Sequence, residues 1–367
     1  MSCDYISLAN TGVQGLHPYQ AGKPVEELER ELGINNIVKL ASNENPLGPS
    51  PVVTASMSAQ FAELTRYPDA NGFNLKQALA EKYNVNANQI TLGNGSNDVL
   101  EILARTFVSP HHEVIFSQYA FVVYPLVTQS IGAKAVAVPA KDWGHDLDAM
   151  AAAITVDTKM IFIANPNNPT GTCLSSQAIL DFLAKVPEQV IVVLDEAYYE
   201  YADEQADSVA WIKQYPNLVI TRTFSKAYGL AALRVGYAIS NDVIADLLNR
   251  VRQPFNCNSL ALAAACAALN DSDYLAKSVA LNNQGMADFE QFFTQYDLPY
   301  IASKGNFITF DTGRDAMPVY QALLQLGVIV RPIGGYGMPN HLRVSIGTEQ
   351  ENQTFKAALI QVLELGQ

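Results

Sequence analysis

The sequence has few of the residues that build metal sites or disulfide frameworks. Its 367 residues include four cysteines and five histidines, with no CxxC pair and no histidines at metal-ligand spacing. We therefore expect reduced thiols and no bound metal. The sequence shows neither a signal-peptide pattern nor an uncharged apolar run of the ~20 residues that cross a bilayer. The expected location is the cytoplasm, with no membrane partner.

Basic residues are also scarce. The chain has 23 lysines and arginines against 36 aspartates and glutamates, a formal net charge of −13. A net negative charge disfavours binding to nucleic acid or to an anionic membrane. It still allows a local basic pocket for a phosphorylated ligand. Hydrophobic residues make up 49% of the sequence, which is typical of a globular protein with a large core. At this length two domains are expected.

Apolar strands alternate with helical patterns through the centre of the chain. Continuous Val/Ile runs such as MIFIA and VIVVL predict an α/β fold, a mostly parallel sheet with helices on both faces. Towards the C-terminus the pattern becomes α+β, and VIVRPI is predicted to be one strand. We expect an N-terminal arm over 1–35 associated with the smaller domain, a large domain over 36–265, and a small domain over 266–367.

A glycine turn joins a predicted strand to a helix at residues 93–98, GNGSND. Free N–H groups at a helix N-terminus bind anions such as phosphate. The turn is not a P-loop, because it lacks the Gly-Lys-Ser/Thr ending, and Asp98 occupies the third glycine position of a dinucleotide fingerprint. Taken alone, this turn is equally compatible with a purely structural role.

Further polar residues follow the predicted strands, where ligands bind in open parallel sheets. NPNNPTG at 165–171 is an ordinary turn if considered alone. Asp195 ends a buried strand and needs a partner, either a structural one or a cationic ligand. Lys226 lies among hydroxyls and small apolar residues, and a lysine with a lowered pKa attacks carbonyls. Two hydroxyls and a guanidinium resemble a phosphate cup: Thr223, Ser225 and Arg234. Together these groups describe a pyridoxal phosphate site.

The motifs NPNNPTG, DEAYYEY and SKAYGLAALRVG resemble those of the fold-type I pyridoxal phosphate enzymes, in particular the class I/II aminotransferases. The resemblance covers essentially the whole chain. LHPYQAGKPVEELERELG, IVKLASNENPLGPSP and RYPDANGFNLKQALAEKY are similar to segments of the histidinol-phosphate aminotransferases. This resemblance implies a seven-stranded, mostly parallel sheet between helices, a smaller α+β domain, pyridoxal 5'-phosphate as cofactor, and a homodimer.

The resemblance also implies roles for individual cofactor residues. Lys226 would carry the cofactor covalently and move the proton, and Asp195 would pair with the pyridine nitrogen. Tyr198 and Asn168 would hydrogen-bond the ring oxygen. Tyr67 would reach the phosphate of the neighbouring subunit's cofactor. The phosphate would be held by backbone N–H groups and by a cup of side chains: Gly95, Ser96, Asn97, Thr223, Ser225 and Arg234.

The substrate residues and the stacking ring follow in the same way. Arg343 resembles the arginine that binds the amino-donor carboxylate, while Arg331 and Tyr19 would help to hold the substrate phosphate. The sequence SQYAFVVYP departs from the usual Pro-Thr-Tyr pattern. Counting back from the tyrosine before the proline favours Phe121 as the stacking ring, with Tyr119 second, although both rings could be core residues.

The implied reaction transfers an amino group between glutamate or 2-oxoglutarate and histidinol phosphate or imidazole acetol phosphate, in histidine biosynthesis. Three alternatives remain open: an aromatic amino-acid aminotransferase, a pyridoxal phosphate lyase or decarboxylase acting on a phosphorylated amino acid, and a non-catalytic regulator. The regulator is disfavoured, since the motifs begin within the first 50 residues and leave no room for a helix-turn-helix module.

Overall fold

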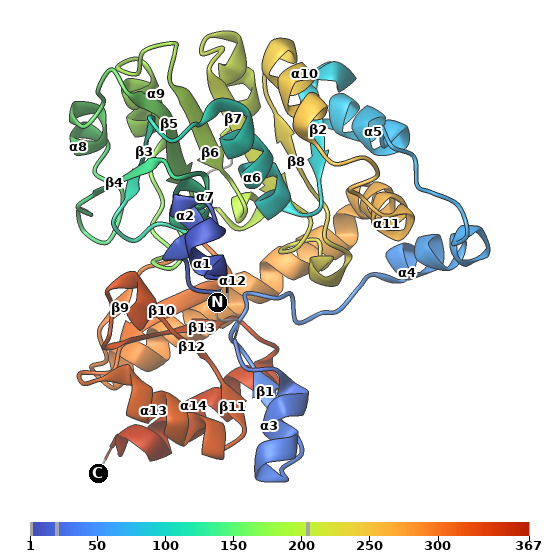
Figure 1. Ribbon diagram of the computed structural model, residues 1–367. Helices are drawn as coiled ribbons and strands as arrows, with labels where there is room; N and C mark the ends of the chain where they lie inside the picture. The colour runs from blue at the N-terminus through green and yellow to red at the C-terminus, as the bar shows by residue number, and fades with distance from the viewer. Residues whose placement is uncertain (1–2, 19–21, 203–205, 367) are drawn as a thin grey trace.

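The computed structural model describes residues 3–18, 22–202 and 206–366. A seven-stranded sheet with the order β2-β8-β7-β6-β5-β3-β4 forms the centre of its larger part (Figure 1). β8 is antiparallel to both of its neighbours and every other pairing is parallel, which confirms the predicted fold class. The strands are β2 (Ile90–Gly93), β3 (Glu113–Ser117), β4 (Lys134–Val138), β5 (Thr158–Ala164), β6 (Ile191–Asp195), β7 (Leu218–Thr223) and β8 (Gly236–Ile239).

Helices cover both faces of this sheet, and two separate apolar cores lie beneath them. One face carries α4 (Pro51–Ser58), α5 (Phe73–Tyr83), α8 (Leu147–Ala152), α9 (Ser176–Leu183) and α11 (Ser259–Leu269). The other carries α6 (Ser96–Phe107), α7 (Val123–Ile131) and α10 (Asp242–Val251). The Val/Ile runs of β5 and β6 are buried because each strand packs against helices on both sides.

A smaller α+β unit lies below the large sheet in Figure 1. Its antiparallel sheet has the order β12-β13-β10-β9 and packs against three helices around an aromatic core. The elements are α12 (Ser272–Gln295), β9 (Tyr300–Ile301), β10 (Phe307–Asp311), α13 (Ala316–Gln325), β11 (Val328–Ile329), β12 (Arg331–Pro332), β13 (His341–Ser345) and α14 (Glu349–Leu363).

The prediction of a single strand at VIVRPI is wrong. Val328 and Ile329 form β11, which pairs with β1 (Val38–Lys39), whereas Arg331 and Pro332 form β12, which pairs with β13. The two halves of the run therefore find different partners. Pro332 has no amide N–H to donate. It lies in β12, the edge strand of the four-stranded sheet, where the missing hydrogen bond is tolerated.

The N-terminal segment contacts both parts of the molecule. Its helices are α1 (Tyr5–Leu8), α2 (Thr11–Gln14) and α3 (Val25–Leu32). α2 packs against α7 of the larger part, while Leu28 of α3 is buried in the core of the smaller unit. Short 3-10 helices complete the chain: η1 (Phe61–Glu63), η2 (Ala87–Gln89), η3 (Tyr199–Tyr201), η4 (Ser208–Lys213), η5 (Ala231–Leu233) and η6 (Gly334–Tyr336). Within the described ranges, no helix is long and apolar enough to span a membrane.

Candidate active site

A cavity of about 210 Å³ lies at the carboxyl ends of β5, β6 and β7, where the larger part faces the smaller unit. Most of the predicted site residues line it: Ser96, Asn97, Phe121, Asn168, Asp195, Tyr198, Thr223, Ser225, Lys226, Arg234, Arg331 and Arg343. Gly95 adjoins it as the N-cap of α6. Of the predicted residues that the structure describes, Tyr67 and Tyr119 do not line the cavity, and Tyr19 lies outside the described residues.

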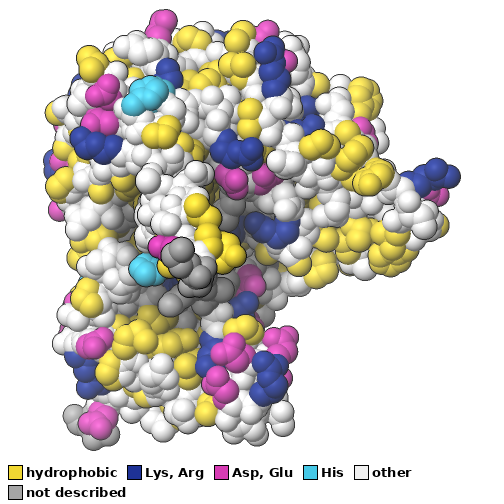
Figure 2. Space-filling view, in the orientation of Figure 1, with side chains coloured by type: hydrophobic (Ala, Val, Ile, Leu, Met, Phe, Trp, Pro, Cys, Tyr) yellow, Lys and Arg dark blue, Asp and Glu magenta, His cyan; other side chains and the backbone are white. Residues whose placement is uncertain are grey.

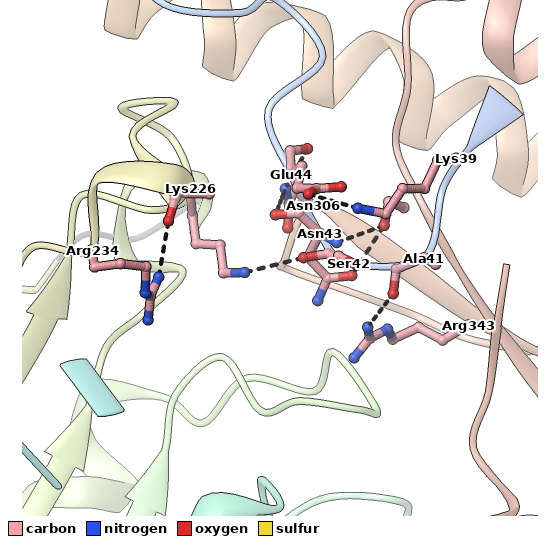
Figure 3. A network of polar contacts seen from close by, with 11 residues as sticks. Lys39, Ala41, Ser42, Asn43, Glu44, Lys226, Arg234, Asn306 and Arg343 are labelled. Carbon is pink, nitrogen blue, oxygen red and sulfur yellow. Dashed lines mark hydrogen bonds and ion pairs between the residues drawn. The ribbon is translucent and has the colours of Figure 1, made fainter. Parts of the chain in front are cut away.

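Lys226 lies in the turn that follows β7, with its amine inside the molecule. Its Nζ donates to the backbone oxygen of Ser42 at 3.3 Å, as Figure 3 shows, and lies 5.8 Å from the centre of the Tyr198 ring. Burial, and next the positive charge of Arg343, lower the pKa of Lys226 to about 8. At pH 7 roughly a tenth of the amine is then neutral, far more than for an ordinary lysine, and the neutral amine is the form that a nucleophile or general base requires.

Asp195, the last residue of β6, is held by two hydroxyl donors. Its Oδ2 accepts from the hydroxyl of Tyr124 at 2.7 Å, and its Oδ1 accepts from Thr221 at 3.0 Å. Burial raises the pKa of Asp195 to about 6, while these hydrogen bonds act in the opposite direction. The sequence analysis missed both donors. Neither contact is visible in the local sequence, because Tyr124 and Thr221 lie far from Asp195 along the chain.

A hydrogen-bonded chain connects Tyr198 to Arg343 across the cavity. The Tyr198 hydroxyl accepts from Nδ2 of Asn43 at 2.8 Å and from Nδ2 of Asn168 at 3.2 Å, and Oδ1 of Asn168 accepts from Nη1 of Arg343 at 2.5 Å. Burial raises the pKa of Tyr198 to about 12, so its hydroxyl keeps its proton. Because that oxygen already accepts two bonds, its O–H is available to donate to a ligand. Asn43 was not predicted, although it lies in the SNENP motif and has a φ of 55°.

The N-terminus of α6 faces a cluster of hydrogen-bond donors. Arg234 donates from Nη1 to Oγ of Ser225 at 3.3 Å, and the amide of Ser225 donates to Oγ1 of Thr223 at 3.1 Å. Gly95 has a φ of 84°, and a Cβ added there would lie 2.5 Å from Nη2 of Arg234. The absence of a side chain therefore lets the guanidinium approach the helix. Backbone N–H groups, hydroxyls and a guanidinium together suit a phosphate dianion.

Two arginines border the part of the cavity that faces the smaller unit. Arg343 donates from Nη2 to the backbone oxygen of Ala41 at 2.9 Å, a contact that Figure 3 shows. Arg331 lines both this cavity and an adjoining one, which also includes Tyr336 and Gly22. Neither Tyr336 nor Gly22 was predicted. The cavity thus contains two guanidinium groups that suit anionic ligands, together with the amine of Lys226.

The two candidate stacking rings differ in position. Phe121 lines the cavity, while Tyr119 packs against Trp143 with ring centroids 5.3 Å apart. Tyr67 lies elsewhere on the molecule, 82% exposed, with its ring stacked on Phe255 at 4.7 Å. Of the two rings, therefore, Phe121 is the candidate for stacking on a ligand in the cavity.

The donor set of the cavity fits pyridoxal phosphate. An amine with a lowered pKa can bond to an aldehyde, a buried carboxylate can pair with a pyridinium nitrogen, and the cradle at Gly95 and Arg234 suits a phosphate. The three groups line or adjoin the same cavity. The site can therefore hold this cofactor and place an amino substrate beside Lys226.

Known proteins resemble the chain over almost its full length. The profile of the family "Aminotransferase class I and II" matches residues 35–359. The chain is 64% identical to histidinol-phosphate aminotransferase 1 of Idiomarina loihiensis, over 96% of this chain and 97% of that protein. It is 61% identical to histidinol-phosphate aminotransferase 2 of Haemophilus influenzae, over 98% and 99%. The crystal structure of histidinol-phosphate aminotransferase from Sinorhizobium meliloti in complex with pyridoxal-5'-phosphate has a TM-score of 0.90, at 29% identity and 96% coverage of both chains.

Proposed function

The chain belongs to the class I and II aminotransferase family, and from this premise we propose that it is a histidinol-phosphate aminotransferase using pyridoxal 5'-phosphate. It would transfer an amino group between glutamate or 2-oxoglutarate and histidinol phosphate or imidazole acetol phosphate, in histidine biosynthesis. The observation that carries the proposal is one cavity lined by Lys226, Asp195, the phosphate cradle and two arginines. The relatives favour this substrate over aromatic amino acids. We also propose a cytoplasmic location, in keeping with the reduced thiols expected from the sequence.

The bound cofactor supplies an aldehyde that takes up the amino group and a ring that withdraws electrons from the substrate's α-carbon. Lys226 would bond to that aldehyde and then, once freed by the substrate amine, move the α-proton. Its pKa of about 8 allows it to accept and return a proton near neutral pH. Asp195 would stabilise positive charge on the ring nitrogen, and Tyr198 with Asn168 would hold the ring oxygen.

The remaining predicted residues would hold the phosphate, the ring and the substrates. The phosphate would be bound by Gly95, Ser96, Asn97, Thr223, Ser225 and Arg234. Phe121 would stack on the ring. Arg343 would bind the donor carboxylate, and Arg331 with Tyr19 would bind the substrate phosphate. Guanidinium groups suit both anions, so one cavity can serve two substrates of different charge distribution.

We further propose a homodimer whose interface includes the segment around α4 and η1. Figure 2 shows hydrophobic side chains along this projecting segment. Val52, Phe61 and Leu64 are exposed by 54%, 56% and 59%, and Tyr67 by 82%. Clustered apolar surface of this kind marks a protein interface. A second copy covering this face would bring Tyr67 to the partner's cofactor phosphate. The large domain would span 36–265 and the small one 266–367.

A coupled assay tests the proposed function. The purified chain, loaded with pyridoxal phosphate, should convert histidinol phosphate and 2-oxoglutarate to imidazole acetol phosphate and glutamate, with a higher kcat/KM than for phenylalanine. Lys226→Ala should abolish both turnover and the visible absorbance of the bound cofactor. Preference for phenylalanine would point to the aromatic enzyme, and carbon dioxide release to a decarboxylase; either result would overturn the proposal.

A further inference from the structure

Tyr124 lies behind the wall of the cofactor cavity and touches two of its members. Its hydroxyl donates to Oδ2 of Asp195 at 2.7 Å. Its ring meets the ring of Phe121 edge-on, with centroids 5.8 Å apart and an interplanar angle of 83°. Asp195 and Phe121 both line the cavity, whereas Tyr124 is fully buried. One residue thus contacts both the group assigned to the ring nitrogen and the group assigned to the ring face.

The core fixes the position of this tyrosine. Its ring stacks on Phe162 of β5, with centroids 4.5 Å apart and planes 1° apart. Phe162 is itself fully buried in the centre of the sheet. Aromatic side chains have few rotatable bonds, and a ring packed on a core strand has little freedom. The hydroxyl therefore remains directed at one carboxylate oxygen.

Asp195 needs such donors because burial favours its neutral form. Burial raises the pKa of the carboxyl group, and the bonds from Tyr124 and Thr221, with the Ala197 amide, oppose that rise. The nearby Glu196 acts in the same direction as burial. A charged carboxylate favours a proton on the pyridine nitrogen, whereas a neutral acid does not.

We propose that Tyr124 is a positioning residue that keeps Asp195 charged and aimed at the cofactor ring nitrogen while its ring supports Phe121. The proposal rests on the proposed function, since it assigns a partner to Asp195. It predicts that loss of one hydroxyl, outside the cavity and without direct contact with substrate, changes the protonation of the cofactor.

Tyr124→Phe tests the proposal, because it removes the hydroxyl and retains both ring contacts. The holoenzyme is loaded with pyridoxal phosphate carrying ¹⁵N in the ring, and the ¹⁵N chemical shift is measured by NMR. We expect a shift towards neutral pyridine. A hydrogen bond to a charged group corresponds to roughly a tenfold to hundredfold effect, so kcat should fall by about that much. KM for both substrates should stay within about twofold, because no substrate contact is lost.

Two further variants separate this effect from a general loss of packing. Tyr237→Phe removes the hydroxyl of another buried tyrosine, whose 2.7 Å partner is Tyr83, and should change neither the ¹⁵N signal nor kcat. Thr221→Val removes the other side-chain donor to Asp195 and should move the signal in the same direction as Tyr124→Phe. If Tyr124→Phe does not fold, an unchanged ¹⁵N signal in Thr221→Val would overturn the claim that hydroxyl donors keep Asp195 charged.

Each outcome bears on one claim. An unchanged ¹⁵N signal in folded Tyr124→Phe holoenzyme overturns the proposal, and so does a fall in kcat without a change in that signal. If the wild-type chain does not bind the cofactor through Lys226, the proposed function fails instead. The two failures are therefore distinguishable.

Discussion

A methyl group added at Gly95 would lie 2.5 Å from Nη2 of Arg234. A Cβ atom does not make a non-bonded contact this short, so the guanidinium occupies the space that a side chain at Gly95 would need. Arg234 itself has a φ of 56°, an unusual backbone conformation for a non-glycine residue. Close contact between the helix N-terminus and the guanidinium thus depends on glycine at position 95.

Gly95→Ala should weaken cofactor binding, because the new methyl group displaces Arg234 and disturbs the phosphate cradle. Loss of one charge-assisted hydrogen bond raises the dissociation constant of pyridoxal phosphate by about tenfold or more. Fluorescence titration of the apoenzyme measures this. Gly313→Ala is the matched control, since Gly313 also has a positive φ, 68°, but nothing within 4 Å of its added Cβ. Equal affinities of the two variants for pyridoxal phosphate would contradict the role of Gly95 and Arg234 in binding its phosphate.

The sequence predicted this turn as an anion site but did not predict the approach of Arg234. Free N–H groups at a helix start are a local property, readable from GNGSND. The distance between Gly95 and Arg234 depends on the pairing of β2 with β8, which brings together segments far apart in the chain. Local signals therefore predicted the kind of site, while its geometry depended on tertiary contacts.

The same distinction explains the other successes and failures. The Val/Ile runs predicted a covered parallel sheet because both of its faces must be apolar. VIVRPI was read as one strand because its two partners, β1 and β13, lie in distant segments. Tyr124 was not predicted as a site residue, because nothing in its immediate sequence indicates that its hydroxyl reaches Asp195.

Arg343→Lys should raise KM for glutamate, whose carboxylate Arg343 would bind, by roughly tenfold or more, and should raise KM for histidinol phosphate less. The guanidinium donates to Asn168 and Ala41 from two nitrogens while it lines the cavity, and a lysine ammonium cannot reproduce that fork. Steady-state kinetics with each substrate in turn measure the change. Arg314→Lys alters an exposed arginine and should leave KM unchanged. If Arg343→Lys behaved in the same way, Arg343 would not bind the substrate.

Capture of pyridoxal phosphate by the apoenzyme should become faster as pH rises, with a midpoint near pH 8. Only the neutral amine of Lys226 attacks the aldehyde, and burial lowers its pKa to about 8. Stopped-flow absorbance at a series of pH values gives the midpoint. Arg343→Gln should move that midpoint upward, since the positive charge of Arg343 helps to lower the pKa. A wild-type midpoint near 10.5 would mean that the amine is not desolvated in solution.

Glu200 should make the apoenzyme less stable as pH rises from about 4.5 to 7. Burial raises its pKa to about 7, so the folded state binds a proton that the unfolded chain releases near 4.5. The stabilisation is complete below the unfolded pKa and is lost as pH rises through the folded pKa. At most ~3 kcal/mol of unfolding free energy is involved. Urea unfolding of Glu200→Gln across this range should show a weaker pH dependence than the wild type. Identical slopes would exclude this linkage.

Mixing two impaired variants tests whether Tyr67 acts across a dimer interface. Tyr67 is 82% exposed and does not line the cavity of its own chain. Lys226→Ala is expected to be inactive, and Tyr67→Ala to bind the cofactor weakly because a phosphate contact from the partner is lost. In a mixed dimer, the site that keeps Lys226 receives Tyr67 from the other copy.

Unfolding and refolding the two variants together should therefore restore tight cofactor binding and turnover in part of the population. Each variant refolded alone is the control, and sedimentation velocity shows whether dimers of the 39.9 kDa chain have formed. If Tyr67 served its own subunit, the site with Lys226 would still lack it, and mixing would restore nothing. If dimers form but activity does not recover, the dimer stands and the assignment of Tyr67 to the partner's site is wrong. If the chain stays monomeric, the proposed dimer is wrong.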